Sequence, residues 1–285
     1  MYYLNLGCGN RYHPKWINID INAKHPNVFS LDVCKGIPLE DNCCEAVYHS
    51  HLLEHLKRID ARFLMKECFR VLRRGGVIRV AVPDLEKICK IYLKKYELAL
   101  AGDKMGAADY DWILLEMFDQ MVREQSGGDM LDYLCRQDLP NRSFLYSRIG
   151  EELNDIVEHN KVQYARSLSS FKLSNGSIKN HLKMSKCVRL LAHQIQAKLL
   201  RVILGEERIR AYKIGLFRLQ GEIHHWMYDR FSLSRLLVDT GFRNPIVVSA
   251  CCSQIPSWSE FNLDTLPNGT VIKPDSLFME AIKPE

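Results

Sequence analysis

Strand and helix patterns alternate along the first 99 residues. Short apolar strands are predicted at residues 2–6, 16–21, 27–31, 45–49 and 77–82. A helix over residues 60–72 precedes the last of these strands, and Gly75-Gly76 is predicted to cap its C-terminal end. Strands that alternate with helices favour a parallel sheet, and such sheets bind ligands at the carboxyl ends of their strands.

This alternation stops near residue 100. Residues 100–220 carry only helix and loop patterns, including a long amphipathic helix over 183–204. Strand patterns return at 245–250 and 276–282, after a helix over 232–240 that Ser232 is predicted to cap. We therefore expect an α/β fold: a doubly wound, mostly parallel, seven-stranded sheet with a large helical insertion after the fifth strand. Residues 1–99 would be the cofactor-binding half of the core, 100–220 the insertion, and 221–285 the closing helix and strands.

The bulk composition favours a cytoplasmic protein. No apolar run is long enough to cross a bilayer, and a strand that begins at residue 2 leaves no room for an export signal. The ten cysteines include no C-x-x-C pair and are expected to be reduced. The net charge of +5 is concentrated between Ile178 and Lys213. That stretch fits a solvated helix face or a contact with anionic lipid or phosphate. Nucleic acid is disfavoured, because no aromatic residues are interleaved for base stacking.

A glycine turn follows the first strand directly, in Gly7-Cys8-Gly9-Asn10. Glycine there allows positive φ and close approach of a ligand to the backbone. A dinucleotide fingerprint would need a third glycine at position 12, which is Tyr12, so a nicotinamide enzyme is disfavoured. Asp20, at the end of the second strand, could accept both hydroxyls of a ribose or be a turn residue. Asp32, after the third strand, could bind the amine of adenine or cap a loop.

Together these features resemble class I S-adenosylmethionine-dependent methyltransferases. Five segments carry the resemblance between Leu4 and Leu85: Leu4-Asn5-Leu6-Gly7-Cys8-Gly9-Asn10, Ile17-Asn18-Ile19-Asp20, Ile37-Pro38-Leu39-Glu40-Asp41, His49-Ser50-His51-Leu52-Leu53-Glu54-His55-Leu56 and Phe69-Arg70-Val71-Leu72-Arg73-Arg74-Gly75-Gly76. The resemblance implies S-adenosyl-L-methionine as cofactor. It puts Gly7, Cys8 and Gly9 near the methionine moiety, Asp20 on the ribose, Asp32 and Val33 by the adenine, and His49 and Ser50 at the pocket floor. The usual acid of the first motif is Asn5 here, whose amide oxygen can still bind a cofactor amine.

A second segment, His224-His225-Trp226-Met227-Tyr228-Asp229 and the helix after it, resembles methyltransferases of surface-polysaccharide biosynthesis. That resemblance implies O-methylation of a sugar in a glycan or in its lipid-linked or nucleotide-linked precursor. Two alternatives stay open. The acceptor could be another small molecule or a nucleic acid, or the chain could be a non-catalytic, cofactor-binding scaffold in a glycan assembly complex. The insertion could be a lid that selects the acceptor, an arm that forms a homodimer, or a surface that meets the inner face of a membrane.

Histidines supply the candidate catalytic groups. The sulfonium is already a good electrophile, so the enzyme mainly has to align the reactants, but a hydroxyl acceptor also needs a base. We expect His224 to be that base; otherwise it packs beside Trp226. His51 is the second candidate, as a wall residue facing the acceptor or as a loop histidine. The pattern His51-x-x-Glu54-His55 also fits an inverted zinc protease. Because it straddles the end of a strand, it is not expected to bind metal.

Overall fold

The computed structural model describes residues 1–136, 138–151, 153–154, 156 and 205–285. Within these residues seven strands form one sheet, in the order β3-β2-β1-β4-β5-β7-β6. The strands are β1 (Tyr2–Leu6), β2 (Ile17–Asp20), β3 (Val28–Ser30), β4 (Cys44–Ser50), β5 (Leu72–Pro83), β6 (Arg243–Val248) and β7 (Ser276–Ile282). All neighbours are parallel except those of β7, which runs antiparallel to β5 and β6. The predicted α/β class and seven-stranded sheet are confirmed.

The register of the central strands brings their carboxyl ends to one edge. Leu6 of β1 is level with Ile19 of β2 and with His49 of β4. The residues that follow these three positions are Gly7, Asp20 and Ser50. Since parallel strands deliver their carboxyl ends to the same side of a sheet, this edge gathers the turn, the acid and the polar strand end that the sequence singled out.

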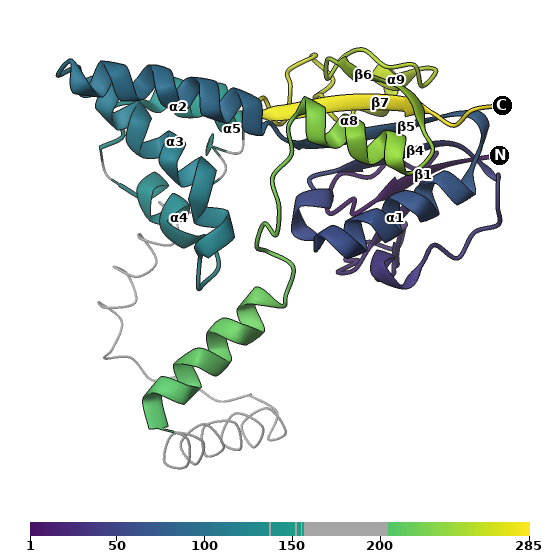
Figure 1. Cartoon of the computed structure of the whole chain (residues 1–285), viewed down its shortest axis with the longest axis horizontal. Coiled ribbons are helices and arrows are strands. Elements are labelled where there is room, and N and C mark those ends of the chain that lie inside the picture. The colour runs from purple at the N-terminus through teal and green to yellow at the C-terminus, as the bar shows by residue number, and fades with distance from the viewer. Residues whose placement is uncertain (137, 152, 155, 157–204) are drawn as a thin grey trace, which may run out of the picture.

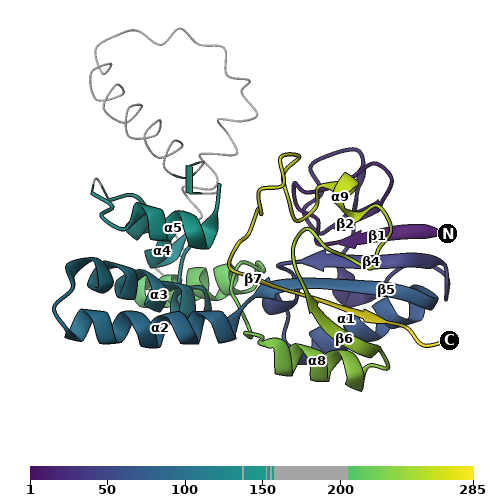
Figure 2. The same cartoon turned by 90° about the horizontal axis from the view of Figure 1, so that it is seen from above.

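One face of the sheet is covered by α1 (Arg58–Val71) and α8 (Arg230–Asp239), which lie on the same side in Figure 2. Apolar residues of both helices and of the strands form the largest buried cluster of the described residues. The predicted caps of these helices were wrong. Gly75 and Gly76 lie inside β5, because α1 already ends at Val71. The N-cap of α8 is Asp229, and Ser232 is the third helical residue of its capping box.

The other face has a different cover. The connections after β1 and β2 contain no helix within the described residues. Instead, the segment between β6 and β7 crosses this face and carries the short helix α9 (Trp258–Phe261), as Figure 2 shows. Trp258 and Phe261 pack there against Trp16 and Tyr48. Aromatic packing from the C-terminal part of the chain therefore covers this side of the glycine turn.

A helical body extends from the carboxyl end of β5 (Figure 1). It contains α2 (Leu85–Leu100), α3 (Lys104–Val122), α4 (Gly128–Leu134) and α5 (Arg142–Ile149), and residues 205–218 are also helical. Trp112, Tyr133 and Leu145 are buried in its own small core. The helical insertion after the fifth strand is thus present and begins at Leu85. The helix predicted over 183–204 lies outside the described residues.

Two short 3₁₀ helices complete the core: η1 (Val33–Lys35) after β3 and η2 (Leu53–His55) after β4. Within the part of the chain that the structure describes, no helix is both long enough and apolar enough to cross a membrane.

Candidate functional site

A cavity of about 570 Å³ opens at the carboxyl ends of β1 and β4. Its lining comes from three parts of the chain: the glycine turn, the end of β4, and the C-terminal segment around β7. The lining residues are Asn5, Gly7, Cys8, Gly9, Asn10, Arg11, Tyr48, Ser50, His51, Leu263, Asp264, Ile272, Lys273 and Phe278. The structure therefore brings together six of the predicted site residues, namely Asn5, Gly7, Cys8, Gly9, Ser50 and His51. Its volume suits a small-molecule cofactor.

The glycine turn has the backbone conformation that the sequence predicted. Gly7 and Gly9 have φ values of 62° and 51°, a region that residues with a Cβ rarely adopt. A Cβ on Gly7 would lie 2.9 Å from a side-chain carbon of Leu52, whereas a Cβ on Gly9 would meet nothing within 4 Å. Gly7 is thus needed for packing, and Gly9 leaves open space where a ligand can approach the backbone.

Asn5 is buried beneath the turn. Its Nδ2 donates to the carbonyl of Arg11 at 2.9 Å and to Oδ1 of Asn18 at 3.1 Å. Both hydrogens of the amide are therefore used to hold the turn, which leaves the amide oxygen as the atom that can face a ligand.

Asp20 supports the turn from the neighbouring strand and does not line the cavity. Its Oδ2 accepts from the backbone N–H of Gly9 at 2.8 Å, and its Oδ1 accepts from that of Asn22 at 2.7 Å. Each carboxylate oxygen keeps a second lone pair. Asp32 caps η1 by accepting from the N–H of Cys34 at 3.0 Å, and Val33 is buried. The cofactor roles of Asp20, Asp32 and Val33 stay predictions.

His49 and His51 face different surroundings, although they are two residues apart. His49 is fully buried, and neither ring nitrogen has a hydrogen-bond partner among the described residues. Burial lowers its pKa to about 4, against the opposing charge of Glu54. His51 has a left-handed backbone (φ 50°), and its Nε2 lies 2.7 Å from the hydroxyl oxygen of Ser276. Its Nδ1 lies 3.1 Å from Oε1 of Glu54. A positive φ in a histidine marks a position held by its surroundings.

A second cavity of about 310 Å³ lies between this edge of the sheet and the helical body. Helices α2 to α5 all contribute to its wall, through residues such as Ile88, Trp112, Met130 and Ile149. Glu116 and Arg123 add charged groups. His51 and Lys273 line both cavities. His51 therefore lies at the border between the two cavities.

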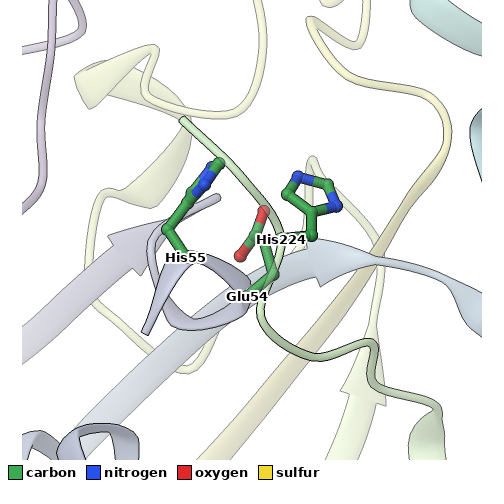
Figure 3. Close-up of side chains that lie close together, drawn as sticks. All are labelled: Glu54, His55 and His224. Carbon is green, nitrogen blue, oxygen red and sulfur yellow. The ribbon is translucent and has the colours of Figure 1, made fainter. Parts of the chain in front are cut away.

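His224, the expected base, lines neither cavity. It is buried, with its ring 4.8 Å from that of His55 in an edge-to-face arrangement. Figure 3 shows the carboxylate of Glu54 between these two rings. Burial lowers the pKa of His224 to about 3, although the charge of Glu54 works in the opposite direction. The ligand atoms of Glu54, His55 and His224 lie within 4.8 Å of one another, so these three residues could hold a metal ion.

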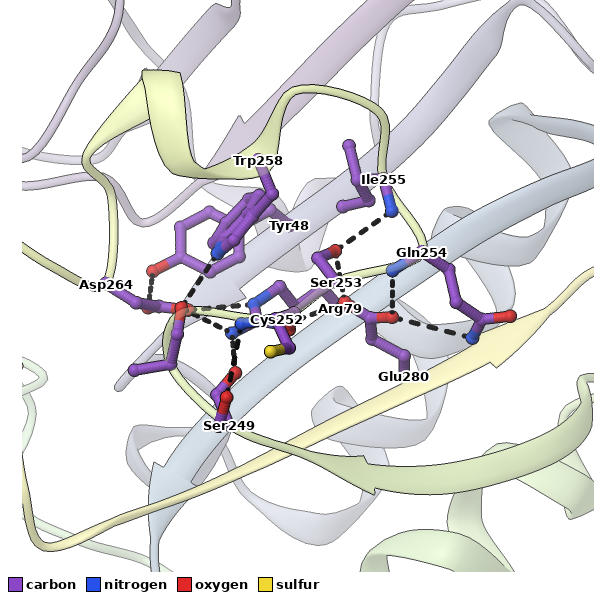
Figure 4. Close-up of polar contacts among 11 residues, drawn as sticks. Tyr48, Arg79, Ser249, Cys252, Ser253, Gln254, Ile255, Trp258, Asp264 and Glu280 are labelled. Atoms are coloured by element: carbon purple, nitrogen blue, oxygen red, sulfur yellow. Dashed lines mark hydrogen bonds and ion pairs between the residues drawn. The ribbon is translucent and has the colours of Figure 1, made fainter. Parts of the chain in front are cut away.

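A buried ion network holds the C-terminal wall of the first cavity (Figure 4). Arg79 of β5 donates through Nε to Asp264 at 2.8 Å and through Nη1 to Glu280 at 2.7 Å. Tyr48 donates its hydroxyl to the other oxygen of Asp264 at 2.5 Å. Asp264 and Tyr48 both line the cavity, and sequence reasoning missed both. Their positions are 216 residues apart, so no local pattern could have paired them.

One part of the chain matches a known protein family. Residues 12–80 match the model of a family described as a methyltransferase domain. A search of curated proteins gave no match.

Three similar solved structures have low sequence identity to this chain. A SAM-dependent methyltransferase from Archaeoglobus fulgidus is 12% identical, with a TM-score of 0.37, over 99% of this chain and 86% of the other. A putative S-adenosylmethionine-dependent methyltransferase from Listeria monocytogenes is 12% identical, with a TM-score of 0.35, over 100% and 91%. PKMT2 from Rickettsia typhi, in complex with AdoHcy, is 10% identical, with a TM-score of 0.31, over 98% and 48%.

Residues 12–80 therefore carry a methyltransferase domain within the seven-stranded sheet, and S-adenosylmethionine is the cofactor that such a domain uses.

Proposed function

We propose that the chain moves the methyl group of S-adenosylmethionine to a hydroxyl of an acceptor bound in the second cavity. The observation that carries this proposal is that His51 lines both cavities. A transfer enzyme must bring two bound molecules into contact at one point, and within the described residues His51 and Lys273 are the side chains common to both linings.

The cofactor would occupy the first cavity. Its methionine moiety would lie along Gly7, Cys8 and Gly9, next to the amide oxygen of Asn5. Beyond the lining of this cavity, the ribose hydroxyls would donate to the remaining lone pairs of Asp20, and the adenine would reach toward Asp32 and Val33. His49 and Ser50 would form the floor. The open space above Gly9 and the two-donor use of the Asn5 amide both support this arrangement.

His51 is the base that the geometry favours, in place of His224. If Glu54 accepts the Nδ1–H of His51, the Nε2 atom keeps a lone pair and points to the side where Ser276 now lies. When bound, S-adenosylmethionine would supply an electrophilic methyl group and would leave as a neutral thioether, so the protein has to align the acceptor hydroxyl and accept its proton. The hydroxyl proton passes to Nε2 of His51. Glu54 then holds the imidazole in one tautomer and orientation, as carboxylates do in catalytic triads.

The acceptor class is proposed to be a sugar of a surface glycan or its activated precursor. The second cavity combines an aromatic wall at Trp112 with the charged groups of Glu116 and Arg123, which suits a polar ring with an apolar face. Four helices of the insertion line this second cavity, which supports the prediction that the insertion is a lid and not an arm that forms a dimer. Methylation of another small molecule and a scaffold without turnover are the rival functions. A homodimer and contact with an anionic membrane surface stay predictions.

Turnover of labelled S-adenosylmethionine with a panel of candidate glycans tests the proposal. Replacing His51 with alanine should lower turnover by roughly 10²- to 10⁴-fold, the usual contribution of a general base, with cofactor affinity nearly unchanged. His225→Ala is the matched control, because His225 is also a partly buried histidine and lines neither cavity. Turnover of His51→Ala within threefold of wild type would remove His51 from the mechanism. A wild-type protein that binds the cofactor and methylates no acceptor would favour the scaffold.

A further inference from the structure

Three side chains of types that can ligate a metal ion lie close together next to His51. Glu54 and His55 are adjacent in η2, and His224 comes from the segment before α8 (Figure 3). Neither cavity is lined by any of the three. A backbone hydrogen bond joins the two segments, from the N–H of His225 to the carbonyl of Glu54 at 2.7 Å, and the N–H of His224 donates to the carbonyl of Gln120 in α3 at 2.9 Å. The cluster is therefore built on fixed backbone.

The polar atoms of this cluster are buried and short of partners. Glu54 is fully buried, and neither carboxylate oxygen has a hydrogen-bond partner among the described residues, although Oε1 lies 3.1 Å from Nδ1 of His51. The Nδ1 of His224 is also buried and has no partner there. A buried carboxylate oxygen without a partner destabilises the fold unless something compensates its charge. A cation between these atoms would satisfy both.

The third residue already has the hydrogen bond that ligating histidines usually make. Nδ1 of His55 lies 3.1 Å from the carbonyl oxygen of Ile223. When Nδ1–H donates to a backbone carbonyl, the tautomer is fixed and Nε2 becomes the free ligand atom. His55 is also half-buried and not fully enclosed, which leaves a route of entry for an ion.

We propose that Glu54, His55 and His224 bind one divalent transition-metal ion through two imidazole nitrogens and one carboxylate oxygen. Imidazole ligands favour Zn²⁺, Co²⁺ and their neighbours over Mg²⁺ and Ca²⁺, which prefer all-oxygen sites. Two histidines and one glutamate are the protein ligands of several catalytic zinc sites, where the fourth position stays open for water or substrate. This proposal reverses the expectation from sequence, in which the His51-x-x-Glu54-His55 pattern was not expected to bind metal because it straddles the end of a strand. The proposed site uses Glu54 and His55 of that pattern, and its third ligand, His224, lies 169 residues further along the chain than His55.

The proposed ion would be separated from His51, the proposed base, by the side chain of Glu54. Glu54 lies next to both His51 and the proposed ion, so the metal and the base share one carboxylate. Metal binding should therefore change how Glu54 orients His51. This coupling rests on the proposed function, whereas metal binding itself does not.

Titration with Co²⁺ and Zn²⁺ tests the site. Untagged protein is stripped with EDTA and exchanged into chelator-free buffer without cofactor; visible absorption then follows Co²⁺, and calorimetry follows Zn²⁺. We expect one equivalent with a dissociation constant on the order of 1 µM or below. Glu54→Gln, which is nearly isosteric, and His224→Ala should each weaken binding by about tenfold or more. His225→Ala is the control and should bind like wild type.

Several outcomes would overturn the site: no binding by wild type, a stoichiometry other than one, or Glu54→Gln binding as tightly as wild type. If His224→Ala does not fold, as judged by circular dichroism, wild type and Glu54→Gln decide the question. Calorimetry with S-adenosylhomocysteine on stripped and metal-loaded protein separates the two proposals. Metal binding without cofactor binding would leave the site and remove the proposed function, and the reverse result would do the opposite.

Discussion

Replacement of Asp20 tests the cofactor arrangement at a residue that supports the glycine turn and is proposed to bind the ribose. Its carboxylate already accepts from the backbone N–H groups of Gly9 and Asn22, at 2.8 and 2.7 Å. In the proposed complex the remaining lone pairs accept the two ribose hydroxyls. Asp20→Ala removes all of these acceptors. Asp20→Asn keeps one oxygen but turns an NH₂ group toward one of the two backbone donors, so one of those hydrogen bonds is lost.

The magnitude follows from the hydrogen bonds involved. A hydrogen bond to a charged group contributes about 1.5–3 kcal/mol, and about 1.4 kcal/mol corresponds to a tenfold change in affinity. Asp20→Ala should therefore weaken S-adenosylhomocysteine binding by roughly 10- to 100-fold. The thermal midpoint should also fall a little, because the glycine turn loses its support. Asp20→Asn should lie between wild type and Asp20→Ala in affinity.

Calorimetry with S-adenosylhomocysteine measures the affinities, and thermal unfolding by circular dichroism reports the fold. Asp111→Ala is the matched control, because it removes the same charge from an exposed position of α3, away from both cavities. It should bind the ligand like wild type. A folded Asp20→Ala protein whose affinity lies within twofold of wild type would refute the contact between Asp20 and the ribose.

Four further substitutions test the scaffold. Gly7→Ala should lower the thermal midpoint more than Gly9→Ala. Both substitutions cost about 1–2 kcal/mol for the left-handed backbone, but only at Gly7 does the added Cβ meet a side-chain carbon, at 2.9 Å. A larger loss for Gly9→Ala would contradict this. Asp229→Ala should cost about 1 kcal/mol at neutral pH. The hydrogen bond from the N–H of Ser232 lowers the pKa of Asp229, so the carboxylate stabilises the fold above its unfolded pKa. The difference between Asp229→Ala and wild type in the free energy of urea unfolding should therefore shrink as pH falls below about 4. A difference that does not change with pH would refute this role of Asp229. Arg79→Met should cost about 3–5 kcal/mol in urea unfolding, because it leaves two buried carboxylates without their cation; a loss under 1 kcal/mol would show that the network is dispensable.

Local patterns predicted the sheet well because its strands are short, apolar and bounded by turn residues. The last strand was predicted at 276–282, which are the bounds of β7, and the glycines of the turn were predicted to allow positive φ, which Gly7 and Gly9 adopt. Helix ends were less accurate. The pair at positions 75–76 looked like a helix cap, but the chain had already entered β5, where tertiary pairing with β4 and β7 decides the conformation.

The composition of the site depended on contacts that no local pattern carries. Asp264 and Lys273 reach the cofactor cavity because the segment between β6 and β7 crosses the sheet, and only the fold specifies that path. The sequence ranked His224 first and His51 second as the candidate base. The proposed function reverses this order, because His51 lines both cavities and His224 lines neither. The contact between His224 and Glu54 likewise adds His224 to Glu54 and His55 as a third candidate metal ligand.

A crystal structure of the protein with S-adenosylhomocysteine tests the central claim most directly. The account predicts the ligand in the 570 Å³ cavity, with its methionine part along Gly7 to Gly9, its ribose on Asp20 and its sulfur toward His51. The 310 Å³ cavity should stay free for the acceptor. A ligand bound among helices α2 to α5, or one whose sulfur points away from His51, would contradict it.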